Sequence, residues 1–254
     1  MIVVFLGTVL LIELGAWYFF KEKTNRFAKT LAPLCHSTVI LSLYQLLKDT
    51  DELLTANQVP YLITGGTLLG AVRHQGIIPW DDDIDIALPA EAQEQFIALI
   101  PAFKKLGYWV LPEIFGYRIV KPVHPSLVWQ WMGKTYFWKM ICLDVFTLVR
   151  NNDKAEGYLP LWPNDYFYLH EIYPLKRYRF GALWVQGPQK ATPYLDRSYG
   201  TEWNTVAYRQ TSHKIHPNAF ERVTLEPKHR QPAQPIGPLT DRTSALLKGV
   251  KIQP

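Results

Sequence analysis

The chain has 254 residues, of which 48% are hydrophobic, and a formal net charge of +5. This length and composition support one hydrophobic core of ordinary size, so we expect one domain with appendages. Because Cys35 and Cys142 are the only cysteines, a disulfide framework is excluded, and no Cys/His spacing predicts a zinc site. The basic residues accompany no nucleic-acid-binding motif, so we expect no nucleic-acid partner.

Residues 2–20 form an almost wholly apolar run, interrupted by Thr8 and Glu13 and followed by Lys21-Glu22-Lys23. As a helix this run is roughly 30 Å long, which is enough to cross a bilayer. A signal peptide is the alternative, but no basic segment precedes the run and no small-x-small cleavage site follows it. We therefore expect a single-pass membrane protein with a transmembrane anchor over residues 1–22. The basic residues after the anchor predict that the domain that follows it lies in the cytoplasm.

The next segments predict a helix and then a glycine turn. Leucine, isoleucine and valine recur at helical spacing after Ser37, so we expect a stem and an amphipathic helix over residues 23–57. The apolar run 61–63 is followed by Gly65-Gly66-Thr67, and residues 67–73 read as a short helix. This order leaves backbone N–H groups free at the helix start, where phosphate oxygens bind well. Thr67 either caps this helix or binds a phosphate.

An acidic segment that alternates with isoleucine follows the turn. In an extended strand Asp81, Asp83 and Asp85 lie on one face, and Asp82, Ile84 and Ile86 lie on the other. Neighbours on one face are roughly 7 Å apart along the strand, so Asp83 and Asp85 can converge on one hard cation. Oxygen-only ligands favour Mg²⁺ or Mn²⁺. A solvated acidic turn is the alternative, and an EF-hand loop fails because Ile86 stands where that loop needs glycine.

Further along, residues 90–105 predict a second amphipathic helix, which Pro101 kinks. Strands are expected at 108–111, 117–121, 127–131 and 139–149, so the fold class is α/β (α+β). The last of these strands contains Asp144 among apolar residues, where the acid either pairs with Lys or Arg or binds a metal. Proline and polar residues accumulate from Thr205 onward, so we expect an extended or flexible tail over residues 205–254.

Several stretches of the chain resemble one protein family. They are Gly-Gly-Thr-Leu-Leu-Gly-Ala-Val-Arg-His (65–74), Ile-Ile-Pro-Trp-Asp-Asp-Asp-Ile-Asp-Ile (77–86), Leu-Asp-Val-Phe (143–146), Ile-Tyr-Pro-Leu-Lys (172–176) and the later Tyr194-Leu195, Tyr199-Gly200 and Trp203. On these residues the chain resembles the LicD family, which includes the fukutin-related proteins. The resemblance implies a nucleotidyltransferase-like mixed β-sheet flanked by helices, with the catalytic domain over residues 58–204.

The resemblance also implies the residues of the site. Asp83 and Asp85 correspond to a metal-binding pair and Asp144 to a third carboxylate, so these three are the expected catalytic residues and ligands of Mg²⁺ (or Mn²⁺). Asp81 is a further candidate metal ligand. The expected donor-binding residues are Gly65, Gly66, Thr67, Arg73 and Lys176.

Members of this family transfer a phospho-alcohol, such as phosphocholine or ribitol phosphate, from a CDP-activated donor to a sugar hydroxyl. The resemblance therefore implies in-line attack of a glycan hydroxyl on phosphorus and release of CMP. Two alternatives stay open: a catalytically silent, membrane-anchored scaffold of a glycan-modifying complex, and a nucleotidyltransferase. A fukutin-like eukaryotic protein would instead face the Golgi lumen. The sequence does not identify the donor alcohol, the acceptor glycan or the oligomeric state.

Overall fold

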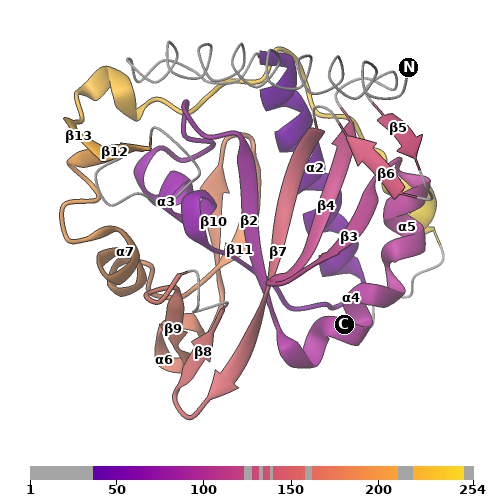
Figure 1. The fold of residues 1–254 in the computed structure, drawn as a ribbon, viewed down its shortest axis with the longest axis horizontal. Helices are drawn as coiled ribbons and strands as arrows, with labels where there is room; N and C mark the ends of the chain where they lie inside the picture. The colour runs from indigo at the N-terminus through magenta and orange to yellow at the C-terminus, as the bar shows by residue number, and fades with distance from the viewer. Residues whose placement is uncertain are drawn as a thin grey trace, which may run out of the picture.

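The computed structural model describes residues 37–122, 128–131, 134–137, 140–157, 162–210 and 220–248. A seven-stranded sheet lies at the centre of these residues. Its strands are β1 (Leu62–Ile63), β2 (Asp83–Pro89), β3 (Trp109–Glu113), β4 (Gly116–Pro122), β7 (Met140–Asn151), β8 (Lys154–Glu156) and β9 (Tyr166–Tyr168). The order is β1-β2-β7-β4-β3, and β8 pairs with both β7 and β9 (Figure 1). The expected mixed sheet with flanking helices is confirmed.

The two strands that carry the predicted acids are neighbours in this sheet. β2 and β7 run parallel, whereas β1 pairs with β2, and β4 with β7, in antiparallel fashion. On one face of the β2–β7 pair Ile84, Leu143 and Val145 are fully buried. Asp83 and Asp85 alternate with buried residues along β2, so they lie on the other face. The alternation read from the sequence is therefore present in the structure.

Helix α2 (Ser37–Ala56) covers the apolar face of the sheet, where it packs against β7 and β2 (Figure 1). Its leucines recur at helical spacing, and Leu43, Leu46 and Leu54 are each fully buried. Each such side chain contributes roughly 1.5–3 kcal/mol when it is removed from water, so this interface is a large part of the core. The predicted helix is confirmed and ends one residue before Asn57.

The single helix expected over residues 90–105 is instead three short elements. They are η1 (Ala90–Ala92), α4 (Gln93–Ala98) and α5 (Ile100–Lys105). Pro101 lies in the first turn of α5, where its missing N–H is tolerated, so the chain starts a new helix there and does not kink an existing one. Gly107, at φ +81°, then turns the chain into β3.

Short helices and two-stranded hairpins make up the rest of the described chain. Their bounds are α3 (Gly65–Arg73), β5 (Val128–Trp131), β6 (Lys134–Phe137), α6 (Leu169–Ile172), β10 (Lys176–Phe180), β11 (Leu183–Gly187), α7 (Thr192–Tyr199), β12 (Val206–Gln210), β13 (Phe220–Thr224), η3 (Pro227–Arg230) and α8 (Ser244–Leu247). β5 pairs with β6, β10 with β11, and β12 with β13, each pair antiparallel.

Residues 231–243, which we call the C-terminal strap, are extended, and they are fastened along α2. The side-chain amide of Gln45 donates to the carbonyl of Thr240 (3.0 Å), and the Thr240 N–H donates back to Gln45 (2.8 Å). One turn further along α2, Arg242 Nη1 donates to the buried carboxylate of Asp49 (2.9 Å). The Pro-rich composition predicted an extended or flexible tail over residues 205–254, but it did not indicate these anchors.

The predicted single-pass membrane anchor, residues 2–20, lies outside the described residues. Within the described ranges no helix is both long and apolar enough to span a bilayer. The longest of them, α2, carries Lys48, Asp51 and Glu52 and turns its apolar side toward the sheet. The prediction of a single-pass membrane protein is therefore corrected, because the described helices provide no membrane span.

Candidate active site

Three carboxylates meet where β2 and β7 run side by side. In the register of this pair Asp85 lies directly opposite Asp144, and Asp83 lies opposite Cys142. One carboxylate oxygen from each of Asp83, Asp85 and Asp144 lies within 4.8 Å of the other two. An all-oxygen donor set with this spacing fits one hard divalent cation. The structure thus brings together the three acids that the sequence grouped.

Asp81 adds a fourth carboxylate from the turn that precedes β2, where its N–H donates to the Ile78 carbonyl (2.9 Å). Carboxylate oxygens of Asp81, Asp82 and Asp83 also lie within 4.8 Å of one another. Asp82 was expected on the opposite face of the strand, and this is corrected, because β2 begins only at Asp83 and alternation does not govern the turn.

The clustered carboxyl groups have raised pKa values. Burial raises the pKa of Asp83 to about 6, and the negative charges of Asp82 and Asp144 add to this effect. Burial, and after it the charge of Asp83, raises the pKa values of Asp81 and Asp85 well above the ordinary aspartate range. Each of these shifts shows that the charged form is disfavoured in the protein without a counter-ion. A bound dication would reverse that preference.

The Gly65-Gly66 turn lies directly against the carboxylates. Gly65 has φ +50°, and a Cβ at this position would lie 2.6 Å from Oδ2 of Asp85. A Cβ on Gly66 would lie 2.8 Å from Oδ2 of Asp81. The Gly66 N–H donates to Oδ2 of Asp85 (2.9 Å). Glycine is required here because only a residue without a side chain lets the backbone approach the acids this closely.

Protein groups already bind the start of α3. This helix begins at Gly65, two residues earlier than predicted, and the Gly65 N–H donates to the Tyr194 hydroxyl (3.1 Å). Thr64, not Thr67, holds the N-cap position. The Thr67 hydroxyl accepts the backbone N–H of Asp85 (2.7 Å). Capping, one of the two roles considered for Thr67, is therefore corrected: this residue ties β2 to α3 and so positions Asp85.

Arg73, an expected donor-binding residue, is buried at the end of α3. Its Nη1 donates to the carbonyls of Trp203 (2.7 Å) and Val206 (3.3 Å). Burial lowers its pKa to about 10, which leaves the guanidinium charged at neutral pH. Arg73 therefore fastens α3 to the segment between α7 and β12.

Lys176, the other expected cationic donor ligand, lies at the exposed start of β10. Its Nζ lies 4.8 Å from the ring centroid of Tyr178. It lines a pocket of about 430 Å³ together with Lys190 and Val72, and none of the four clustered aspartates lines that pocket. Among the described contacts, the structure does not bring Lys176 to the carboxylates.

Nothing in the sequence pattern indicated that Arg118 belongs to this site. Arg118 lies opposite Asp144 in the β4–β7 register and binds both of its oxygens, with Nε to Oδ1 at 2.5 Å and Nη2 to Oδ2 at 2.8 Å. Hydrogen bonding to Asp144 raises the pKa of Arg118. Only the register of β4 against β7 could have identified this partner. Of the two roles considered for Asp144, pairing with an arginine is observed, and this pairing leaves Asp144 beside Asp83 and Asp85.

A buried tyrosine hydrogen-bonds to the glycine turn. Tyr194 donates to the carboxylate of Asp165 and accepts hydrogen bonds from the Thr64 hydroxyl (3.0 Å) and the Gly65 N–H. Its ring stacks on Phe167 with centroids 4.1 Å apart. The Tyr-Leu pair was noted in the sequence, but its contact with the turn was not foreseen.

Comparison with known proteins identifies the family. A family model described as LicD/FKTN/FKRP, nucleotidyltransferase domain, matches residues 58–190, more than half of the chain. Uncharacterized protein RT0683 of Rickettsia typhi is 41% identical over 213 residues, which are 81% of this chain and 62% of that protein. Ribitol-5-phosphate transferase FKTN of Homo sapiens is 26% identical over 182 residues, which are 69% of this chain and 37% of FKTN.

A shorter match has higher identity. Lipopolysaccharide cholinephosphotransferase LicD of Haemophilus influenzae is 48% identical over 40 residues, which are 16% of this chain and 15% of that protein. The chain thus spans less than two thirds of the length of each of these three relatives. The resemblance drawn from the glycine turn and the acidic strand is confirmed: the chain belongs to the LicD/FKTN/FKRP family and carries its nucleotidyltransferase domain over residues 58–190.

Proposed function

We propose that this protein is a metal-dependent transferase that moves a phospho-alcohol group from a CDP-activated donor to a glycan hydroxyl and releases CMP. The observation that carries the proposal is the convergence of Asp83, Asp85 and Asp144 beside the Gly65-Gly66 turn. LicD of Haemophilus influenzae is named a cholinephosphotransferase and FKTN a ribitol-5-phosphate transferase, and these names point to the class of group that is transferred.

The residues present fit a divalent cation. Asp83, Asp85 and Asp144 would hold it, with Asp81 close by, and one guanidinium, that of Arg118, cannot balance four neighbouring carboxylates. A bound Mg²⁺ or Mn²⁺ would supply electrostatic stabilisation of phosphate oxygens.

The protein's own groups have distinct tasks in this proposal. The Gly66 N–H and the Thr67 hydroxyl hold Asp85 from two sides, and Arg118 holds Asp144. A carboxylate of the cluster takes the proton of the acceptor hydroxyl. The acceptor oxygen then forms its bond to phosphorus as the bond between phosphorus and the CMP oxygen breaks.

Release of CMP tests the proposal. We expect the full chain to release CMP from at least one of CDP-choline, CDP-ribitol and CDP-glycerol when Mg²⁺ or Mn²⁺ is present, and not when the ion is chelated. Mass spectrometry of the acceptor distinguishes the outcomes. Transfer of CMP to the acceptor would instead identify a nucleotidyltransferase, and absence of both metal binding and turnover would identify a non-catalytic scaffold.

The raised pKa of Asp83 predicts how metal affinity depends on pH. A cation binds the deprotonated carboxylate, so protons compete with it below the pKa of about 6. The proton of Asp83 alone predicts an increase of about tenfold in Mg²⁺ affinity between pH 5 and pH 7, and we expect at least this increase because protons on Asp81 and Asp85 compete as well. Titration calorimetry in buffers of different ionisation enthalpy measures both the affinity and the proton released. A constant affinity over this range would contradict the assignment of Asp83 as a ligand.

A further inference from the structure

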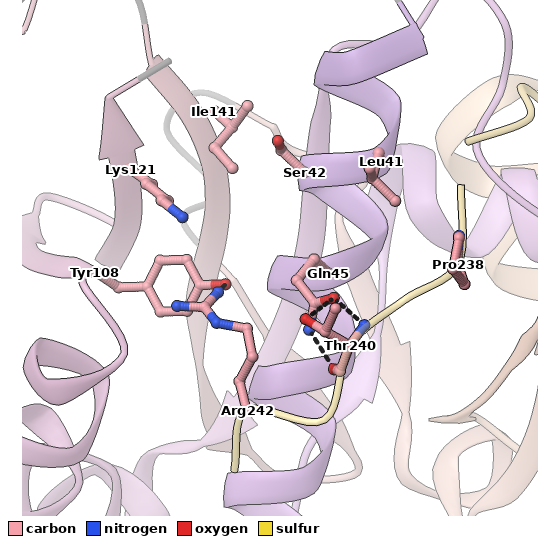
Figure 2. Close-up of a pocket in the computed structure, with 9 residues that line it drawn as sticks. All are labelled: Leu41, Ser42, Gln45, Tyr108, Lys121, Ile141, Pro238, Thr240 and Arg242. Carbon is pink, nitrogen blue, oxygen red and sulfur yellow. Dashed lines mark hydrogen bonds between the residues drawn. The ribbon is translucent and has the colours of Figure 1, made fainter. Parts of the chain in front are cut away.

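A second cavity, of about 340 Å³, lies between α2, the end of β4, the start of β7 and the C-terminal strap (Figure 2). Its walls include Ser42 and Gln45 from α2, Tyr108 and Lys121 from the sheet side, and Arg242 from the strap. Figure 2 shows Lys121, Tyr108 and Arg242 on one side of the cavity and the helix residues on the other. A volume of this size accommodates a small molecule.

This cavity is separated from the carboxylates by the sheet itself. Arg118 pairs with Asp144 across β4 and β7, and Lys121 pairs with Ile141. Because successive side chains alternate between faces, positions three residues apart on one strand point to opposite sides. Lys121 therefore lies on the α2 face, away from Asp83, Asp85 and Asp144.

Lys121 carries a charge that no described acidic side chain pairs with directly. Within the described part of the chain its amino group makes no hydrogen bond or ion pair, and it lies 5.8 Å from the ring centroid of Tyr108. The guanidinium of Arg242 lies 5.1 Å from the same ring. Burial and the charge of Arg242 lower the pKa of Lys121, and together they outweigh the opposing effect of the Asp49 charge.

The nearest acid cannot provide that counter-ion, because its oxygens are already bound. Asp49 is fully buried. It accepts hydrogen bonds from the Tyr108 hydroxyl (2.6 Å), from Gln45 (2.7 Å) and from Arg242 (2.9 Å). Because the charges of Asp49 and Arg242 neutralise each other, the charge of Lys121 gives the described cavity wall a net positive charge.

We propose that this cavity binds a small phosphomonoester, with its phosphate on Lys121 and its organic part against the apolar side chain of Ile141, which Figure 2 shows on the same side of α2 as Lys121. The ammonium group offers three unused donors, which suits a phosphate oxygen. The Ser42 side chain, which Figure 2 shows on the helix wall, is a further polar contact. This site is independent of the proposed transferase reaction.

Calorimetric titration of the full chain with glycerol 3-phosphate, in chelator and without divalent ions, tests the proposal. Without a metal the acidic cluster repels phosphate, so binding under these conditions does not come from the cluster, and the Lys121 variant assigns it to the cavity. We expect one binding site, and we expect Lys121→Gln to weaken it about tenfold or more, because a charge-assisted contact is lost. Lys121 makes no hydrogen bond within the described chain, so this substitution should leave the fold intact, which thermal melting checks.

Two control variants test whether the loss of affinity is specific to Lys121. Lys105→Gln removes the same charge from an exposed position on α5 and should leave affinity unchanged, as should Asp83→Asn at the acidic cluster. No binding by the wild type, or equal weakening by the two lysine variants, would overturn the proposal. Sedimentation with phosphatidic acid vesicles but no binding of free glycerol 3-phosphate would also overturn it, in favour of a lipid headgroup.

Discussion

We expect Asp83→Asn to lower metal-dependent release of CMP from a CDP-alcohol about a thousandfold or more while the chain stays folded. Asparagine keeps the size of the side chain but removes its charge. Stabilisation of phosphate charge by a protein-held metal contributes several kcal/mol, and each ~1.4 kcal/mol is a factor of ten in rate. Because repulsion within the acidic cluster is relieved, the metal-free variant should melt no lower than the wild type.

The matched control is Asp153→Asn, which makes the same chemical change at an exposed position between β7 and β8. Its rate and its melting temperature should equal those of the wild type. Rates are measured as CMP release at saturating Mg²⁺, and melting is followed with and without the ion. Wild-type activity in Asp83→Asn would show that the carboxylate cluster does not bind the catalytic metal.

The second large effect concerns stability: Glu171→Ala should lower the free energy of unfolding by about 3–5 kcal/mol, as breaking a buried ion pair does. Glu171 is 2% exposed, and its carboxylate accepts two hydrogen bonds from Arg197, at 2.9 and 2.5 Å, and one from the Tyr168 N–H, at 3.0 Å. Burial alone would raise the pKa of Glu171, but these bonds outweigh it and lower the pKa. Urea unfolding followed by circular dichroism measures the loss.

Glu202→Ala provides the comparison. Glu202 pairs with Arg222 at 2.6 Å, a short distance like that of the buried pair, but both side chains are 53% exposed. Water screens such a pair and its ordering costs side-chain entropy, so its removal should shift the unfolding midpoint only slightly. If the two variants lost the same stability, burial would not be what makes the Glu171–Arg197 pair strong.

Local pattern was sufficient to predict the acidic strand. Alternation of aspartate with isoleucine predicted which side chains of β2 face the site, and Asp144 stood out as a single acid in an apolar strand. The turn that contains Asp82 was misassigned because alternation holds only within a strand.

The side chains and carbonyls that bind the predicted site residues could not be predicted from local sequence pattern. Arg118 lies opposite Asp144 because of the register between β4 and β7. A shift of this register would give Asp144 another partner, and the sequence alone does not determine the register. Arg73 binds carbonyls about 130 positions away along the chain, and no periodicity encodes such a contact. The resemblance implied donor binding for Arg73, and the structure adds a role in anchoring α3 through backbone carbonyls.

The parallel pairing of β2 with β7 has a consequence for how this protein reaches its native state. Antiparallel neighbours can form from a tight hairpin, but strands in parallel require the whole intervening stretch, residues 90–139, to be accommodated first. Closing so long a loop is entropically unfavourable until tertiary contacts repay it. We therefore expect the acids of β2 and β7 to come together late in folding, and a nascent chain that has not yet synthesised β7 cannot assemble the cluster.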